Sequence, residues 1–309
     1  MTQIGLMFEG QAGVTWARWQ RLLQAAEDLG YQCVFRSDHF SIRPPYEESL
    51  EAWVSLTYAA SHTQRIEFGS LVSPITFRHP ALLARMAASV DDLSNGRLVL
   101  GLGAGWNEHE HRQFGIPFYD KAIRHELFAE GLEVTTRLLH SDTPVTYMGK
   151  HYSLNDAILL PRPKRPGGPP ILIGGNGLRW TLPLVAKYAD EWNGVFIAPQ
   201  GYRERNTRLD ELLQQAGRDP HSVKRSIMTE VVFGVDDAAI RAKLAAQPDL
   251  VDDPVRIIGT PSKIIDQIGA YVDAGAERVM LQWLALDDLD SIEKLAQTVL
   301  PHFHKTIAP

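Results

Sequence analysis

The chain has 309 residues, 44% of them hydrophobic and 22% charged, which is typical of a globular protein that can bury a large core. Its formal net charge of −6 argues against a general nucleic-acid binder, although a small anionic cofactor needs only local backbone donors. The single Cys33 excludes a disulfide framework within the chain. We find no secretory signal, which predicts a cytoplasmic protein, and no apolar run of about 18 residues, which predicts that no segment spans a membrane.

Short apolar runs alternate with longer amphipathic segments along the first part of the chain. The apolar runs predict strands at residues 4–8, 33–37, 66–72 and 98–102. The amphipathic segments predict helices at residues 16–29, 51–61 and 80–93. Thr15 is a suitable cap for the first helix, and Pro80 suits the start of the third because the first N–H of a helix has no partner. The repeated strand–helix unit favours a parallel sheet with right-handed crossovers.

The second half continues the same alternation. Strands are predicted at residues 171–173, 191–196, 226–235 and 278–281. Helices are predicted before Tyr188 and at residues 202–216, 262–274 and 289–300. Eight strands, each followed by a helix, indicate a (β/α)8 TIM barrel, here taken as a single domain over residues 1–309. A doubly wound open sheet is the alternative, but it usually has fewer units and leaves the last strands without a role.

Three stretches interrupt the alternation and are read as insertions at the ends of barrel units. They cover about residues 104–120, after the fourth strand, 141–170, before the fifth, and 245–260, after the seventh. The second contains a hairpin-like segment at residues 145–152. Long loops on a compact barrel are more often lids than linkers.

Asp38 and His39 follow the second predicted strand, and active sites of such barrels gather at the carboxyl ends of strands. A histidine titrates near neutral pH, and a neighbouring carboxylate can raise its basicity and fix its orientation. We therefore predict that these two residues are catalytic. The alternative is a solvated dipeptide on a surface loop.

Three glycines in four residues follow the fifth predicted strand, at Gly174-Gly175-Asn176-Gly177, and Leu178 and Arg179 lead into a helix. Glycine lets the backbone approach a phosphate closely, and a helix start offers free N–H groups. We predict an anion site here, with Arg179 as a further donor. A tight strand-to-helix turn is the alternative.

Glu108-His109-Glu110-His111 raises the question of a metal site. On a helix, positions two apart diverge by about 200°, so His109 and His111 do not share a metal easily. We interpret these residues as solvated charges on a helix. A hydrolase with a metal held by His39, His109 or His111 remains an alternative from a different class of enzyme.

Several stretches, in this order, resemble the bacterial luciferase-like monooxygenase superfamily: Ser37-Asp38-His39-Phe40, Gly69-Ser70-Leu71-Val72, Phe77-Arg78-His79-Pro80, Gly101-Leu102-Gly103-Ala104-Gly105-Trp106-Asn107-Glu108 and Gly174-Gly175-Asn176-Gly177. Within it, the Asp-His-Phe segment is similar to the branch of oxidoreductases that use the deazaflavin coenzyme F-420. The resemblance implies hydride transfer between that coenzyme and an organic substrate that the sequence does not identify. It also implies a homodimer.

The resemblance further implies where the cofactor binds. The ring is expected on a bulge at Leu71-Val72 with a cis peptide bond, and His39, oriented by Asp38, is expected to handle protons beside it. The full set of expected cofactor-binding residues is Ser70, Leu71, Val72, Gly105, Trp106, Asn107, Gly174, Gly175, Asn176, Gly177, Leu178 and Arg179.

The sequence departs from the sugar-phosphate and alcohol oxidoreductases of this branch. Arg43 and Trp106 stand where those enzymes carry a substrate-side Trp and a Glu, so we predict a different substrate pocket formed by Glu9, Arg43 and Trp106. The nearest alternative is an FMN-dependent monooxygenase that receives reduced flavin from a separate reductase. A non-catalytic flavin-binding barrel is a further alternative.

Overall fold

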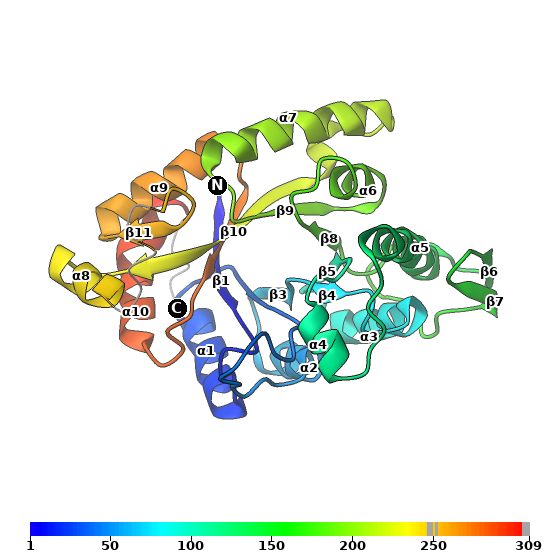
Figure 1. Ribbon diagram of the computed structural model, residues 1–309, viewed down its shortest axis with the longest axis horizontal. Coiled ribbons are helices and arrows are strands. Elements are labelled where there is room, and N and C mark those ends of the chain that lie inside the picture. Colours follow the sequence, from blue (N-terminus) through cyan, green and yellow to red (C-terminus); the bar gives the residue numbers. More distant parts are fainter. Residues whose placement is uncertain (246–249, 251–252, 305–309) are drawn as a thin grey trace.

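Eight parallel strands close into a barrel in the computed structural model, which describes residues 1–245, 250 and 253–304 (Figure 1). Strand β10 pairs with both β9 and β12, and β12 pairs with β1, so the eight strands form a closed ring. The predicted (β/α)8 TIM barrel is confirmed. The open-sheet alternative is wrong because this pairing joins the last strands to the first.

The strands of the barrel lie close to their predicted places. They are β1 (Gln3–Phe8), β2 (Cys33–Arg36), β3 (Glu67–Ser70), β5 (Leu98–Gly103), β8 (Ile171–Gly174), β9 (Glu191–Val195), β10 (Lys224–Phe233) and β12 (Arg278–Gln282). The predicted strand at 66–72 is shorter than expected. It ends at Ser70, and the chain resumes pairing with β5 as β4 (Ser73–Pro74).

Helices cover the outside of the barrel. They are α1 (Trp16–Asp28), α2 (Ala52–His62), α3 (Pro80–Leu93), α5 (Lys121–His140), α6 (Thr181–Tyr188), α7 (Pro199–Gln215), α8 (Asp237–Ala245), α9 (Pro261–Asp273) and α10 (Leu289–Val299). The side chain of Thr15 accepts a hydrogen bond from the N–H of Arg18, which confirms the predicted cap of α1.

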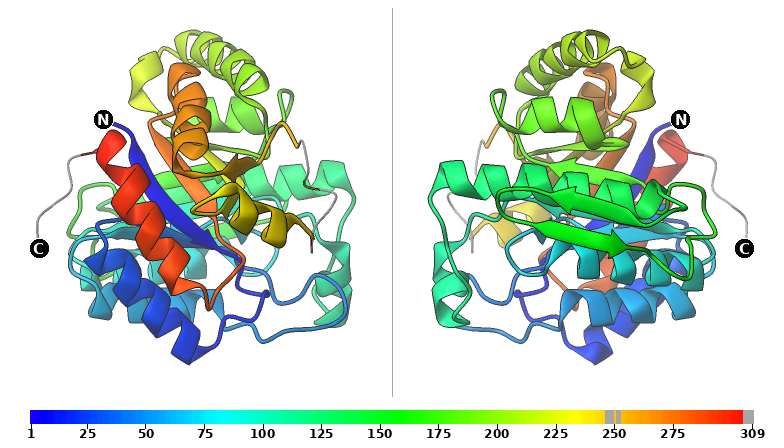
Figure 2. Two further views of the ribbon diagram at one scale, coloured as in Figure 1. Left: turned by 90° about the vertical axis from the view of Figure 1, so that its left-hand side faces the viewer. Right: turned by 90° about the vertical axis from the view of Figure 1, so that its right-hand side faces the viewer.

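Each predicted insertion contains secondary structure of its own. The first holds the short helix α4 (Glu108–Gln113), and the second holds an antiparallel hairpin, β6 (Val145–Met148) and β7 (Ser153–Ala157). This hairpin lies against α5 on the outside of the molecule (Figure 2, right). The third adds β11 (Ile257–Gly259) in parallel to the end of β10, and its residues 246–249 and 251–252 lie outside the described residues.

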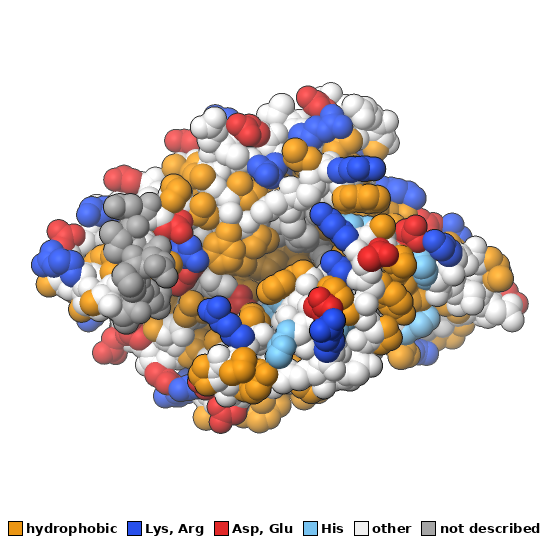
Figure 3. Space-filling view, in the orientation of Figure 1, with side chains coloured by type: hydrophobic (Ala, Val, Ile, Leu, Met, Phe, Trp, Pro, Cys, Tyr) orange, Lys and Arg blue, Asp and Glu red, His pale blue; other side chains and the backbone are white. Residues whose placement is uncertain are grey.

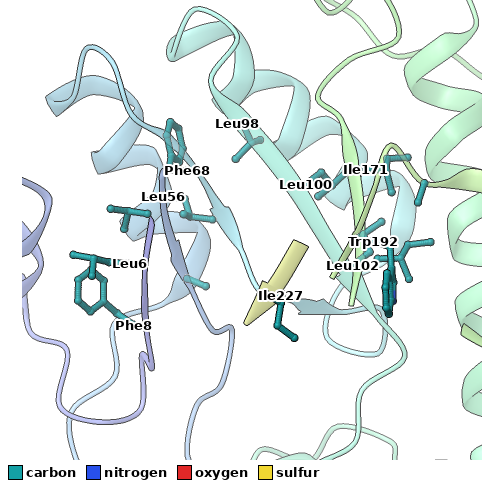
Figure 4. Close-up of a cluster of buried hydrophobic side chains, with 14 of the residues drawn as sticks. Leu6, Phe8, Leu56, Phe68, Leu98, Leu100, Leu102, Ile171, Trp192 and Ile227 are labelled. Carbon is teal, nitrogen blue, oxygen red and sulfur yellow. The ribbon is translucent and has the colours of Figure 1, made fainter. Parts of the chain in front are cut away.

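The apolar core has two parts. The larger part fills the space between the strands and the surrounding helices, where side chains such as Phe8, Leu100 and Trp192 are buried (Figure 4). The smaller part fills the inside of the barrel with side chains from alternate strand positions, among them Met7, Phe35 and Met280. The barrel is therefore packed through its middle.

Polar side chains close the amino-terminal end of the barrel. They are the first residues of five strands: Gln3, Glu67, Glu191, Lys224 and Arg278. The fully buried guanidinium of Arg278 pairs with Glu67 and, at 3.1 Å, with Glu191, and its Nε donates to Gln3 Oε1 at 2.8 Å. This cluster, called the polar plug below, leaves the carboxyl ends of the strands as the end where a ligand can enter.

Candidate active site

The loops that follow β1, β2, β5 and β8 converge around the carboxyl end of the barrel, called the mouth below. Figure 3 shows this face, with α4 toward the viewer, and a hollow near its centre walled by hydrophobic side chains. Glu9 follows β1, His39 follows β2 and Trp106 follows β5. The structure thus brings three of the predicted site residues to the same end of the barrel.

His39 is held by a buried carboxylate. Its Nδ1 lies 2.8 Å from Oε1 of Glu110, and Oε2 of Glu110 accepts the backbone N–H of Phe40 at 3.0 Å. Glu110 is 1% exposed, whereas the His39 side chain is 15% exposed. The described part of the chain provides no partner for His39 Nε2. The ring is therefore fixed through one nitrogen while the other stays available at the mouth.

The environment of His39 changes its proton affinity. Burial disfavours the charged imidazolium, but the hydrogen bond to Glu110 and the negative charge of that carboxylate outweigh burial and raise the pKa of His39 above its ordinary value of 6.5. The protonated form consequently persists to higher pH than in a free imidazole. A group of this kind can give or take a proton near neutral pH.

Asp38 does not orient His39, and that part of the prediction is wrong. The buried carboxylate accepts a hydrogen bond from Ser73 Oγ at 2.7 Å and pairs with Arg78 at 2.5 Å. Arg78 also pairs with Glu51 at the start of α2. Neighbours in an extended chain point to opposite sides, so Asp38 turns toward the helices while His39 faces α4.

The prediction that α4 carries only solvated charges is also wrong. Glu110 is buried against His39, and His111 is fully buried, with contacts to Thr76 Oγ1 at 2.8 Å and the carbonyl of Asn107 at 2.7 Å. His109 is exposed beside Tyr46. The two histidines diverge as the helical spacing predicts.

The metal alternative finds no donor set in the described ranges. His39, His109 and His111 each bond to a different group, and no cluster of three or more His, Cys, Asp or Glu side chains is arranged to hold a metal ion there.

Sequence reasoning missed Glu110, although a signal was present. Asn107 caps α4 by accepting the N–H of His109 at 3.1 Å, so Glu110 lies one turn after the cap and on its side of the helix. Nothing in the sequence, however, places α4 against the loop that follows β2. That contact also depends on Asn107, whose Nδ2 donates to the carbonyl of Ser41 at 3.0 Å.

The predicted bulge after β3 is present, and the peptide bond between Leu71 and Val72 is cis as expected. Glycines on the neighbouring strands make room for Val72. A Cβ at Gly103 would lie 2.6 Å from Val72 Cγ2, and one at Gly174 would lie 3.0 Å from Cγ1. Gly174 therefore serves the packing of the bulge. Ser70 is buried, and its hydroxyl donates to the carbonyl of Gly101 at 2.9 Å.

The loop after β8 has one part that is fixed by side-chain hydrogen bonds and another part whose backbone N–H groups are free. The side chain of Asn176 joins the backbone of Val195, accepting its N–H at 3.0 Å and donating to its carbonyl at 2.7 Å, so this side chain fixes the loop instead of facing a ligand. The N–H groups of Gly177, Leu178 and Arg179 have no intramolecular partner among the described residues, and α6 has no side-chain cap. These free donors fit an anion.

The three predicted substrate residues differ in their surroundings. The carboxylate of Glu9 accepts hydrogen bonds from Gln282 at 2.5 Å and Gln11 at 2.8 Å and forms no ion pair within the described ranges. Trp106 is 64% exposed, and its ring meets the His39 ring edge-on at 5.4 Å. Arg43 is exposed on the loop after β2 and, among the described residues, forms no hydrogen bond or ion pair with Glu9 or Trp106. Gly105, before Trp106, has a positive φ of 76° and is backed by Thr76.

Comparison with known proteins identifies the family of the chain. Residues 2–254 match the family model described as luciferase-like monooxygenase. An F-420-dependent glucose-6-phosphate dehydrogenase from Amycolatopsis mediterranei is 34% identical over 314 residues, covering 89% of this chain and 91% of that protein. An F-420-dependent hydroxymycolic acid dehydrogenase from Mycobacterium tuberculosis is 30% identical over 312 residues, covering 90% of this chain and 82% of that protein.

Solved structures share the fold. An F-420-dependent secondary alcohol dehydrogenase in complex with an F-420–acetone adduct superposes with a TM-score of 0.85 at 21% identity, covering 98% of this chain and 99% of that one. A monooxygenase from Streptomyces bottropensis superposes with a TM-score of 0.83 at 20% identity, covering 98% and 100%. The predicted resemblance is confirmed: the chain is an enzyme that belongs to the luciferase-like monooxygenase family of oxidoreductases.

Proposed function

We propose that this protein transfers a hydride between coenzyme F-420 and a small organic substrate, with His39 handling the proton. The observation that carries the proposal is the imidazole at the mouth, anchored at Nδ1 by buried Glu110 and open at Nε2. The curated relatives named above act with F-420. In this assignment His39 is catalytic, Glu110 is a positioning residue, and Asp38 supports the site through Arg78.

The residues at the mouth fit a flat ring that carries a phosphate. Val72 projects from the bulge against Gly103 and Gly174, where a Cβ would crowd it, so the backbone of both neighbouring strands lies close to the bulge. The free N–H groups of residues 177–179 would hold the phosphate. A bound deazaflavin supplies a carbon that carries hydride and reacts poorly with oxygen, while the protein supplies orientation and proton transfer.

The remaining predicted contacts complete the proposed site. Ser70, Gly105, Asn107 and Asn176 shape the backbone around the cofactor through the hydrogen bonds and turns described above. Glu9, Arg43 and Trp106 would face the substrate. The exposed indole of Trp106 covers one side of His39 and would exclude water from it once a ligand is bound.

Titration of the purified protein with F-420 and with FMN tests the assignment. We expect F-420 to bind more tightly, and the reduced or oxidised coenzyme to change its absorbance only when a substrate is present. Absence of F-420 binding would overturn the proposal.

The second candidate is an FMN-dependent monooxygenase supplied by a separate flavin reductase; the matching family is named after luciferase-like monooxygenases. It predicts oxygen consumption with reduced FMN. Measurement with an oxygen electrode, with F-420 in place of FMN as the control, separates the two functions.

We also propose a cytoplasmic homodimer with residues 1–309 as one domain. Exposed apolar side chains on adjacent helices support an interface: Val54 on α2 is 56% exposed, and Leu82 on α3 is 60% exposed. No described helix is long and apolar enough to cross a membrane. Sedimentation of the native chain and of Val54→Glu tests the dimer; a monomeric native chain contradicts it.

A further inference from the structure

Three polar side chains lie at the mouth where the adjacent strands β1, β10 and β12 end. Each follows by two residues a methionine of the small core inside the barrel, and side chains two apart along a strand share a face. They are Glu9, Gln282 and Glu230, called the acceptor floor below. Gln282 is in register with Glu230 on one side and with Met7 on the other, so the three side chains are neighbours.

Two buried side chains of the floor each have an oxygen without a donor. Gln282 and Glu230 are each 6% exposed. The amide of Gln282 donates to Glu9 at 2.5 Å, and because a carboxylate only accepts, this contact leaves Oε1 of Gln282 unused. Arg256 occupies only Oε2 of Glu230, at 2.6 Å. The described residues offer no donor to Oε1 of either side chain, so a ligand in the mouth meets acceptors in search of donors.

Glu9 is held in a fixed position by neutral groups. Each of its oxygens accepts a hydrogen bond from an amide, one of them from Gln11 at 2.8 Å. Gln11 is fixed in turn by the hydroxyl of Ser37, which donates to it at 2.8 Å. Burial, the largest influence on the pKa of His39, lowers it, whereas Glu110 and then the charge of Glu9 raise it. The carboxylate of Glu9 is therefore preorganised and acts on the imidazole.

The negative charge of the floor is not balanced within the described part of the chain. Glu9 forms no ion pair there. The guanidinium of Arg36 is buried on the outer side of β2, where its bonds go to a hydroxyl and two carbonyls. Arg256 pairs with Glu230 but also with Asp253, so two carboxylates share one cation. A positively charged ligand would compensate the excess charge.

A cavity of about 260 Å³ opens beside the floor, next to Glu230. Its described wall includes the aromatic residues Phe233 and Trp283. The cation in this wall, Lys243, pairs with Asp288 at 2.8 Å. Ligand pockets usually start at about 300 Å³, so this cavity suits the apolar part of a small molecule whose polar end lies at the floor.

We propose that the substrate is an organic cation, a protonated amine or imine, whose N–H groups are bound by the acceptor floor. This inference rests on the proposed function and names the substrate class of its site. The open oxygens need donors and the carboxylates need positive charge, and a protonated nitrogen supplies both. A neutral alcohol supplies only the hydrogen bonds, and a phosphate or carboxylate is repelled.

Binding of three molecules of similar shape and different charge tests the inference. The probes are benzylamine, benzyl alcohol and benzoate, titrated by calorimetry into the full chain at neutral pH, with and without F-420. We expect benzylamine to bind at least about ten-fold tighter than the alcohol, benzoate to bind weakest, and the preference to shrink with salt. Glu9→Gln keeps the shape of the side chain and should weaken benzylamine binding by about ten-fold or more, while alcohol binding changes by less than about two-fold.

Glu293→Gln on α10 is the matched control, because Glu293 is exposed and accepts a hydrogen bond from the amide of Gln297. Glu230→Gln is the second variant, since it removes the charge at the other end of the floor and should also weaken benzylamine binding. A thermal melt confirms that each variant is folded.

The outcomes separate the inference from the proposed function. If F-420 binds but benzylamine has no advantage over the other probes, or keeps its advantage in both floor variants, the inference is wrong and the proposed function stands. Absence of binding by all three probes also overturns the inference. If benzylamine binds through Glu9 but F-420 does not bind, the floor recognises a cation and the proposed function fails.

Discussion

The two ends of the barrel both bury charged side chains, but they treat them differently. In the polar plug, Arg278 faces two carboxylates and an amide, and all of these groups come from the first residues of strands. At the mouth, the His39 ring has one hydrogen-bond partner among the described residues, through Nδ1, and the Glu9 carboxylate accepts hydrogen bonds there from two neutral amides. The comparison teaches that the strand starts hold buried charges in ion pairs with one another, whereas the loops at the other end leave a charged group available for chemistry.

His39→Ala removes the group that the mouth leaves available for chemistry, and we expect the largest effect from this variant. Removing the proton-handling group should reduce kcat by about 10²- to 10⁴-fold while cofactor binding stays within a few-fold. Steady-state kinetics and a binding titration check this, with His62→Ala on α2 as the control. A variant that keeps full turnover would show that His39 does not move the proton.

Arg278→Met removes the cation at the centre of the polar plug. It leaves the carboxylate of Glu191, which is only 4% exposed, without its ion pair, so we expect the free energy of unfolding to fall by about 3–5 kcal/mol. Denaturant unfolding measures the change. The control is Arg208→Met on α7, where the pair with Glu211 is exposed and the expected change is about 0–1 kcal/mol. Equal effects in the two variants would contradict a structural role for the plug.

Glu110→Gln keeps His39 and alters only its hydrogen-bond partner, so it tests what the buried carboxylate contributes at the mouth. Burial remains but the carboxylate is lost, so the pKa of His39 should fall, and NMR titration of the imidazole measures it. We expect kcat near neutral pH to fall by about 10- to 100-fold through the loss of a hydrogen bond to a charged group. An unchanged imidazole titration would contradict the positioning role.

The same pair makes stability depend on pH with a definite sign. Because the pKa of His39 is raised in the folded state, its contribution to stability is fully present below the unfolded pKa and is lost as pH rises through the folded one. The native protein should therefore lose stability across that interval more than Glu110→Gln does. Denaturant unfolding at several pH values provides the measurement.

Gly103→Ala has the smallest expected effect. The new Cβ would lie 2.6 Å from Val72 Cγ2, so the bulge must shift, at a cost of about 1–3 kcal/mol, and cofactor affinity should fall with it. Gly269→Ala on α9 is the control, because nothing lies within 4 Å of its Cβ position; it should stabilise the helix by about 0.5–1 kcal/mol. If Gly103→Ala leaves the stability unchanged, the bulge accommodates the extra methyl group and the packing argument is wrong.

The fold could be predicted from the sequence because each strand–helix unit is local and its apolar pattern is strong. The mouth was predicted in part, since His39 and Trp106 follow directly from the ends of strands. The Glu110 contact could not be predicted, because it joins loops 71 residues apart and depends on how α4 docks. The predicted side-chain roles of Asp38, orienting His39, and of Asn176, contacting the cofactor, were not found. A polar side chain after a strand can bond to the backbone or to a neighbouring side chain as readily as to a ligand, and the sequence does not distinguish these cases.

The polar plug also has a consequence for the order of events during turnover. Coenzyme and substrate then share one entrance, so the ligand that binds deeper must bind first and dissociate last. If the coenzyme occupies the inner position against the bulge, the substrate binds only after the coenzyme, and steady-state kinetics should follow a compulsory order.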